Sequence, residues 1–524
     1  MKPWTLRNQD LDSLRGGSDL LNFKKKNNLY DRLVVKEEGL DLKHIIFKVQ
    51  SELPIWENSQ DSSEDIANNI KLATEGDLRH KEVVKKKIVA YLISEHKQIN
   101  YNNIDSIIKQ YHVNYYSNFY SNILPENKYD RKVYDYFEKY KVNKNSSVEE
   151  KYRKLSQIIY QECYGLSVID ELADDINFVD GLWTNGINDI RIQFKGLKRR
   201  VVGLKFENEN SYRQAIANAI SYDAFGDIGA DNPEVLCSRR NGSRVTAIFP
   251  PIYKIPYLNI RNFNENIVNK NDILNEGSHN EAIIKFNECV IKGLPNFSII
   301  GPMGAGKSTY LRMLIGEYNE NLGILVIQPT DELRLENYYK NMDIRTHIYS
   351  KENPPSELLE LSFREDRDII FQGEIRTPQE AYMDIYVKQR IAKGSGDTYH
   401  ARDFNEFITT RRNLLMQTML YKDHITAERD IADSNDLIYQ LLYDSETGKR
   451  YINKIIEVEK LDKGEFKERV IFEYDISKEI WVIKNNLSDR LYKRLREEKR
   501  FNSEVEEDLR NLLSENKLLE IETC

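Results

Sequence analysis

The chain has 524 residues, more than one hydrophobic core usually organises, so about two to four domains are expected. Its formal net charge is −8, and no global excess of basic residues indicates a nucleic-acid-binding protein. The four cysteines, Cys163, Cys237, Cys289 and Cys524, are widely spaced and indicate free thiols rather than a metal knuckle or a disulfide framework.

Residues 1–155 are highly charged and mostly helical in pattern. Within residues 80–96, apolar side chains recur at the spacing of one helical face. A polar stretch, residues 141–150, ends in a cap-like serine pair followed by acidic residues, which predicts a linker and then a helix start. No function is assigned to this region.

Residues 156–265 are predicted to form a small α+β domain. A helical stretch covers residues 153–175, and short alternating runs between turn residues then predict strands. These runs are residues 188–194, 243–251 and 256–263. A polar stretch, residues 266–280, is predicted to be the linker to the next domain.

Residues 281–485 alternate between strand and helix patterns, which is typical of a parallel sheet flanked by helices and predicts an α/β domain. The tail, residues 486–524, reads as a charged helix that is solvated or binds a partner.

The strongest motif is GPMGAGKS at residues 301–308, which follows a short apolar run and precedes a helix. It fits the phosphate-loop pattern GxxxxGK[ST] at every fixed position. Glycines let backbone N–H groups surround phosphate oxygens, while Lys307 reaches the β- and γ-phosphates and Ser308 can bind Mg²⁺. We therefore predict ATP and Mg²⁺ as ligands, with the nucleotide held by Gly301, Gly304, Ala305, Gly306, Lys307, Ser308 and Thr309.

Acidic residues follow two later apolar runs. Asp331 and Glu332 come after residues 324–327, and Glu374 comes after residues 369–371. An acid at the carboxyl end of a parallel strand faces the crevice where nucleotides bind, although a solvated loop acid is the ordinary alternative. A third segment places His400 after a short run of small residues, where a structural histidine is the ordinary alternative.

Together these segments resemble the secretion-ATPase superfamily, whose members power type II and type IV secretion and type IV and Tad pili. The motifs that carry the resemblance are residues 301–308, 330–333 (TDEL), 373–376 (GEIR) and 398–401 (TYHA). Residues 242–251 (GSRVTAIFPP) and 260–263 (IRNF) are similar to the Tad and conjugative branch. The likeness runs in order through residues 160–475.

The chain departs from that pattern at three places. Gln328 and Pro329 stand where the family has two acids, and Ala392 stands where it has an earlier histidine. Residues 237–240 (CSRR) replace a D-A-R strand. These departures leave room for a subunit with little turnover.

The resemblance implies a RecA-like phosphate-loop domain, a smaller α+β N-terminal domain and an additional helical N-terminal region. It also implies roles for the site residues: Ser308 and Glu374 hold Mg²⁺, Glu332 orients or deprotonates water, and His400 senses the γ-phosphate. Arg244 and Arg261 would bring positive charge from the small domain.

The implied assembly is a homo-oligomer, a hexameric ring, that works with an integral membrane platform protein and binds no stable nucleic acid. No apolar run reaches the length of about 18 residues that spans a bilayer, so we expect a cytoplasmic protein, peripheral at the membrane through its partners. Two rival functions stay open at this point. One is a nucleotide-binding scaffold. The other is a nucleic-acid motor on the same core, with a basic patch at residues 198–200.

Overall fold

The computed structural model divides the chain into two compact units, residues 1–265 and residues 266–524, and each is described by itself. No helix within the described ranges is long and apolar enough to cross a membrane. The structure describes residues 42–56, 62–95, 104, 107–108, 147–175, 179–194, 197–201, 204–222, 233–262, 274, 277–349, 353–391, 393–444, 447–514 and 518–519. The 266–280 linker prediction, Phe263, Ala392 and Cys524 lie wholly or mostly outside these ranges.

The first unit contains a helical layer, in agreement with the predicted helical N-terminal region. Its α-helices are α3 (Leu42–Glu52), α4 (Ser63–Thr74), α5 (Leu78–Glu95), α8 (Val148–Cys163), α9 (Asp170–Asp174) and α10 (Glu209–Ala219), with short 3-10 turns η1 (Leu53–Ile55) and η2 (Ser167–Ile169). Val84, Ile88 and Leu92 form the buried stripe of α5. Ser147 and Glu150 form a capping box that starts α8, as the sequence predicts.

The helix predicted over residues 153–175 is interrupted. Helix α8 ends at Cys163, and the chain turns at Gly165 before η2 and α9 begin. A Cβ at Gly165 would lie 2.4 Å from Oδ1 of Asp170, the same oxygen that accepts the N–H of Leu166 at 3.0 Å. The Asp170 carboxylate therefore closes a turn that only glycine fits, and one long helix becomes two.

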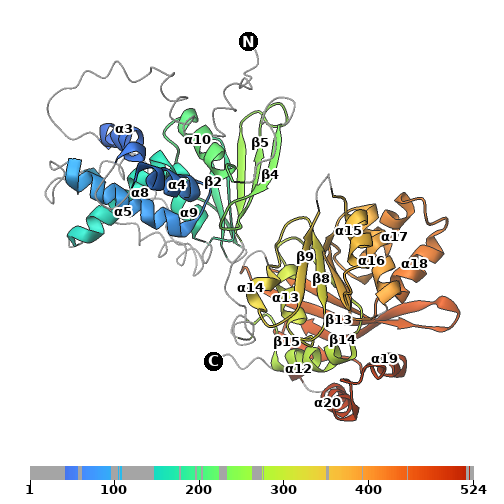
Figure 1. Ribbon diagram of the computed structural model, residues 1–524. Helices are drawn as coiled ribbons and strands as arrows, with labels where there is room; N and C mark the ends of the chain where they lie inside the picture. Colours follow the sequence, from blue (N-terminus) through green and yellow to red (C-terminus); the bar gives the residue numbers. More distant parts are fainter. Residues whose placement is uncertain are drawn as a thin grey trace. The chain divides into compact units, whose positions relative to one another are not determined.

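Six antiparallel strands form the sheet of the first unit, in the order β3-β2-β1-β6-β5-β4. One face packs on the helices through residues such as Leu182, Ile192, Val245 and Ile260, while the alternate residues are more exposed. Figure 1 shows the helices grouped beside this sheet. Its strands are β1 (Gly181–Asn185), β2 (Ile190–Phe194), β3 (Leu197–Arg200), β4 (Glu234–Ser238), β5 (Arg244–Ile248) and β6 (Tyr257–Arg261).

A ten-stranded sheet organises the second unit, in the order β16-β15-β14-β13-β12-β7-β11-β10-β8-β9. In the order given, the strands from β12 to β9 run parallel, and those from β13 to β16 pair with their neighbours antiparallel. The strands are β7 (Phe297–Ile300), β8 (Ile324–Gln328), β9 (Ile344–Ile348), β10 (Ile369–Ile375), β11 (Gly396–Tyr399), β12 (Leu437–Tyr443), β13 (Arg450–Lys460), β14 (Phe466–Asp475), β15 (Ile480–Ile483) and β16 (Leu518–Leu519).

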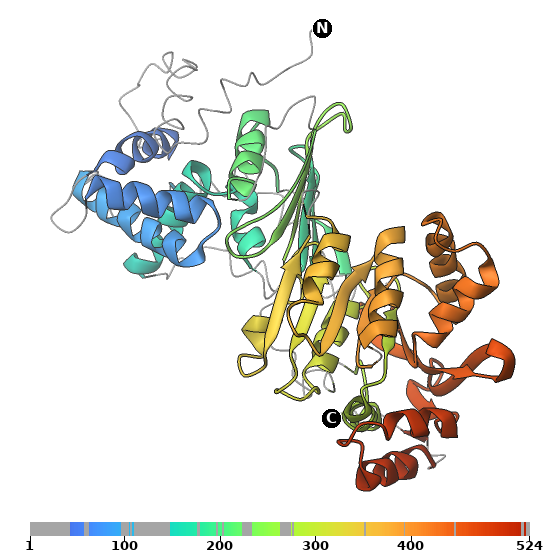
Figure 2. The same cartoon turned by 45° about the vertical axis from the view of Figure 1, so that its right-hand side comes forward.

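Helices cover both faces of this sheet, which confirms the predicted α/β class (Figures 1 and 2). Ile299 packs in the core on one face and Ile300 in the core on the other, so β7 is buried on both sides. The helices are α12 (Glu281–Val290), α13 (Lys307–Ile315), α14 (Leu335–Tyr338), α15 (Pro355–Ser362), α16 (Pro378–Ile391), α17 (Phe404–Gln417), α18 (His424–Asp433), α19 (Asp489–Leu495) and α20 (Ser503–Ser514), with η3 (Ile291–Gly293) and η4 (Asp462–Gly464).

The charged tail differs from its prediction as one solvated helix. It forms two helices, α19 and α20, which pack on the second unit. Tyr492, Leu495 and Leu509 are fully buried in the same core as Ile299, because the apolar stripe of each helix meets the sheet-covering layer. The high charge of this segment therefore belongs to its outer faces.

Candidate phosphate-binding site

The loop after β7 has a backbone shape that glycine makes possible. Gly304 and Gly306 have φ of 84° and 89°, which L side chains rarely adopt. A Cβ at Gly301 would lie 2.4 Å from the carbonyl oxygen of Leu441 on β12. Helix α13 begins at Lys307 directly after this turn, so its first N–H groups point toward the loop. This strand, loop and helix agree with the order predicted from sequence.

Lys307 is buried, with 7% of its surface exposed, and lies across its own loop. Its ammonium donates to the carbonyl oxygens of Gly301 and Pro302 at 3.0 and 3.1 Å. The same nitrogen lies 3.1 Å from Nδ1 of His400, which follows the end of β11. The structure thus brings together two residues that lie 93 positions apart in the sequence.

His400 connects the loop to Glu374 near the end of β10. Nε2 of His400 lies 2.7 Å from Oε1 of Glu374, and Arg376 contacts the other carboxylate oxygen. Burial alone raises the pKa of Glu374, but the hydrogen bonds from His400 and Arg376 outweigh it and lower the pKa to about 2. Glu374 is therefore ionised and accepts hydrogen bonds from His400 and Arg376, so it has no proton to release.

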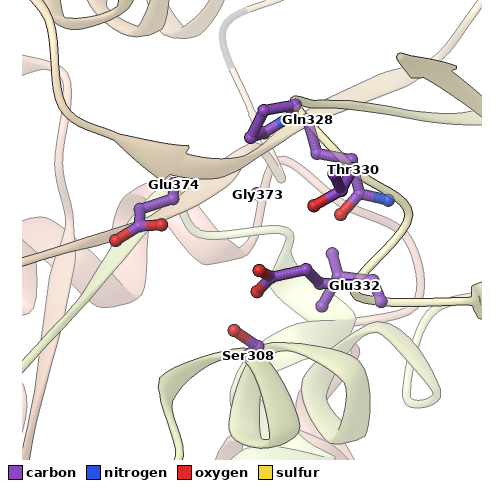
Figure 3. Close-up of a pocket in the computed structure, with 8 residues that line it drawn as sticks. Ser308, Gln328, Thr330, Glu332, Gly373 and Glu374 are labelled. Carbon is purple, nitrogen blue, oxygen red and sulfur yellow. The ribbon is translucent and has the colours of Figure 1, made fainter. Parts of the chain in front are cut away.

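A pocket opens beside this chain of contacts (Figure 3). Figure 3 shows the Glu332 carboxylate directed toward the Ser308 hydroxyl, with Glu374 on the neighbouring strand. Gly373 is required here because a Cβ would lie 2.8 Å from Cβ of Gln328. The lining residues are Ser308, Gln328, Pro329, Thr330, Glu332, Leu333, Gly373 and Glu374.

The donor set fits Mg²⁺ bound together with phosphates. Mg²⁺ prefers oxygen ligands and usually keeps one or two carboxylates, substrate phosphates and waters. The pocket offers the Ser308 hydroxyl and the carboxylates of Glu332 and Glu374. No group of three or more His, Cys, Asp or Glu side chains in the described residues could hold a metal ion by itself, so the nucleotide would complete the set.

The two adjacent acids after β8 separate in the structure. Glu332 lines the pocket, whereas Asp331 accepts the amide of Gln328 and the backbone N–H of Arg334, both at 2.9 Å. Gln328 stands where the resembling family has an acid, and its amide is used inside the loop. Asp331 is thus a loop-forming residue, and Glu332 is the acid that faces the site.

A buried charge cluster beneath the site was not anticipated from the sequence. We call it the β7 cluster. Its centre is the Asp397 carboxylate on β11, 2.6 Å from the Lys388 ammonium and 2.6 Å from the Ser298 hydroxyl on β7. Burial raises the pKa of Asp397, but the charges of Arg411 and Lys388 outweigh it and hold the pKa below its ordinary value. The members are Ser298, Asp384, Lys388, Asp397 and Arg411.

The sequence does show part of this cluster, because Asp384 and Lys388 lie four residues apart on α16. Their pairing partners are not visible, because Lys388 and Arg411 come from different helices. The cluster joins β7, which carries the phosphate loop, to β11, which carries His400 at its end. It therefore holds two site-bearing strands in register.

Arg244 and Arg261 lie in the first unit, directly opposite each other on β5 and β6. The buried hydroxyl of Ser243 donates to the Asn262 side chain at 2.8 Å, and this bond connects the two arginine-bearing segments. The GSRV and IRN segments thus place two arginines at opposite positions of neighbouring strands. Their predicted catalytic role concerns the other unit and stays a prediction.

Comparison with known proteins identifies the central part of the chain. Residues 239–444 match the family described as Type II/IV secretion system protein, a range that includes the arginine pair, the phosphate loop, Glu332, Glu374 and His400. These residues are therefore similar to a type II/IV secretion ATPase domain. No curated protein matches the chain in sequence.

Several solved structures are also similar to this chain. The VirB11 ATPase of the Brucella suis type IV secretion system, in complex with sulphate, is 17% identical over 55% of this chain and 92% of its own, with a TM-score of 0.31. The Legionella pneumophila ATPase DotB is 13% identical over 66% and 86%, with a TM-score of 0.39. The pilus retraction motor PilT with bound ADP is 13% identical over 68% and 94%, with a TM-score of 0.38. Similarity at this level does not establish a shared activity.

Proposed function

We propose that the second unit binds ATP with Mg²⁺ and hydrolyses it to ADP and phosphate. The observation that carries this proposal is the continuous contact from Lys307 through His400 to Glu374, beside a pocket that contains Ser308 and Glu332. Phosphoryl transfer depends mainly on positioned charge, and these groups supply it at one edge of one sheet.

Each residue has a role that follows from its surroundings. Lys307 would exchange its two loop carbonyls for phosphate oxygens, since a charged acceptor makes the stronger hydrogen bond. His400 contacts both Lys307 and Glu374, so a shift of Lys307 toward phosphate would alter the contact between His400 and Glu374. Glu332 would accept a proton from, or orient, the attacking water. Ser308 and Glu374 would hold Mg²⁺, which neutralises phosphate charge when bound.

We further propose that turnover powers protein secretion, pilus assembly or conjugative transfer. This part of the proposal is supported by the family of residues 239–444. The protein would work as a hexameric ring at the cytoplasmic face of a membrane, bound to an integral membrane platform protein. In this assembly Arg244 and Arg261 would bring positive charge to the nucleotide.

A nucleotide-binding scaffold is the second candidate. It is favoured by Gln328 and Pro329, which line the pocket without providing an acid. The scaffold would bind ATP through the same loop and release little phosphate.

Purified protein separates the two candidates. ATP binding is measured by calorimetry and phosphate release by a coupled assay, each with and without Mg²⁺. We expect Mg²⁺-dependent release at a rate within the ordinary enzyme range of about 1 s⁻¹ or above. ATP binding with no release, even after addition of membranes that carry the partner, would establish the scaffold instead.

A further inference from the structure

Thr330 is a pocket residue whose hydroxyl makes no hydrogen bond within the described part of the chain. Its Oγ1 is buried, and among the described residues it has no hydrogen-bond partner. Thr330 lines the same pocket as Ser308, Glu332 and Glu374, and Figure 3 shows it on the Glu332 side of that pocket. A buried hydroxyl that lacks a partner costs stability, so an atom of this kind at a site points to a ligand.

Two groups of the same loop are already engaged in other hydrogen bonds. The Gln328 amide donates to Asp331 at 2.9 Å, and the Glu332 N–H donates to the backbone oxygen of Thr330 at 2.7 Å. This short turn holds the Thr330 hydroxyl and the Glu332 carboxylate in a fixed relation two residues apart. A molecule that enters the pocket can therefore contact both side chains at once.

We propose that the Thr330 hydroxyl positions the water that attacks ATP, together with Glu332. The inference rests on the proposed ATP hydrolysis. A hydroxyl donates one hydrogen bond and leaves the other lone pair of a water oxygen available for attack. Glu332 accepts the proton of that water as its oxygen bonds to the γ-phosphorus and the bond from phosphorus to the β–γ bridging oxygen breaks. ADP departs, and Thr330 acts as a positioning residue without entering the reaction.

The substitution Thr330→Val tests this role because valine keeps the shape and removes the hydroxyl. We expect kcat to fall about tenfold, the size of one hydrogen bond made in the transition state. KM and the calorimetric affinity for Mg²⁺-ATP should stay within about twofold. The melting temperature of the nucleotide-free variant should be unchanged or higher, since an unpartnered buried hydroxyl has been removed. Thr330→Ser should restore most of the lost kcat.

A matched control is Thr398→Val in the same unit. The Thr398 hydroxyl is buried but donates to the carbonyl oxygen of Gly373 at 2.6 Å. Removing it breaks an existing bond, so this variant should melt at a lower temperature than the wild type. A lower melting temperature in Thr398→Val but not in Thr330→Val separates a structural hydroxyl from a ligand-directed one.

Three outcomes overturn the role of Thr330 while the proposed function stands. They are a valine variant with kcat within twofold of an active wild type, a loss of Mg²⁺-ATP affinity with unchanged kcat, and a lower melting temperature with no rescue by serine. A wild type that binds ATP without releasing phosphate overturns the proposed function itself, and with it the role of Thr330.

Discussion

The two units arrange their candidate phosphate-binding residues in different ways. In the second unit the loop lysine, the histidine and the acid meet at one edge of a parallel sheet, and each contacts another residue of that unit. In the first unit the relevant feature is a pair of arginines that face each other across two antiparallel strands. The second unit thus presents a formed pocket, and the first places two arginines opposite each other on neighbouring strands.

This difference has a physical origin. Parallel strands end at the same edge, so loops from distant parts of the sequence converge there. An antiparallel sheet with one open face displays side chains in rows instead, and Arg244 and Arg261 are neighbours in such a row. We infer that binding is a property of the second unit, whereas fast turnover draws on the arginine pair.

The largest effect is expected at Lys307. Lys307→Ala removes the only loop cation from the phosphate position, so ATP turnover should fall to background in a phosphate-release assay. Lys340→Ala, at an exposed lysine of the same unit, is the control and should keep wild-type turnover. Turnover retained by Lys307→Ala would show that the second unit does not use this loop for catalysis.

The next effect concerns the first unit. Arg261→Ala should leave ATP bound but lower kcat by about 10³-fold, the scale of arginine contributions to related transfers. Specific activity of the wild type should also rise with protein concentration as the ring assembles. Arg213, which forms an exposed ion pair with Glu209 at 2.8 Å, provides the control Arg213→Ala.

An Arg261→Ala protein that turns over within twofold of the wild type would confine catalysis to the second unit. If the wild type is a monomer and its specific activity does not depend on protein concentration, the proposed ring is contradicted.

A third prediction compares one buried cation in each unit. Lys81 lies 2.5 Å from Asp170 and 2.8 Å from Asp174, while Lys388 belongs to the β7 cluster. Lys81→Met and Lys388→Met each leave buried carboxylates short of a cation, so each should lower the free energy of unfolding by about 3–5 kcal/mol. Urea unfolding measures the loss, and hydrogen exchange assigns it to a unit.

Only Lys388→Met should also lower ATP turnover, because its cluster includes Ser298 on β7, the strand that leads into the phosphate loop. Equal turnover in the two variants would show that the β7 cluster stabilises the unit without fixing its site.

A smaller effect is expected at Glu374. Glu374→Gln should keep ATP binding and lower hydrolysis by about 10²-fold, the scale of losing a water-positioning or metal-coupled group. Its matched control is Glu336→Gln, at an exposed acid of the same unit. If ATP binding disappears while the fold survives, Glu374 serves binding rather than the hydrolytic step.

The smallest effect is the acid dependence of the Glu374 contact. Folding lowers the pKa of the Glu374 carboxyl from 4.5 to about 2. The contacts of this carboxylate therefore stabilise the protein fully above pH 4.5, and their contribution is lost as the pH falls toward 2. The difference in melting temperature between wild type and Glu374→Gln should therefore be nearly the same at pH 7 and pH 5. A difference that vanishes by pH 5 would mean that the His400 and Arg376 contacts do not hold this carboxylate.

The sequence by itself determined the local elements and the resemblance to a family. Phosphate-loop glycines, the strand before them and the helix after them are neighbours in the chain, so their pattern is complete within residues 297–315. The alternation of strands and helices likewise determined the α/β class, because periodicity records which face of each element is buried. The end of α8 at Gly165 escaped prediction, since its cause is the side chain of Asp170 closing the turn.

Only the tertiary structure decided which polar residues meet. The resemblance assigned the catalytic role to Glu332, but only the structure shows that Asp331 forms the loop while Glu332 lines the pocket. Lys388, Asp397 and Arg411 look like ordinary surface charges until two strands and two helices bring them together away from water. The charged tail is a similar case, because its buried stripe is defined by the layer that it covers. Contacts of this kind depend on the packing of distant segments, which a pattern along the chain does not record.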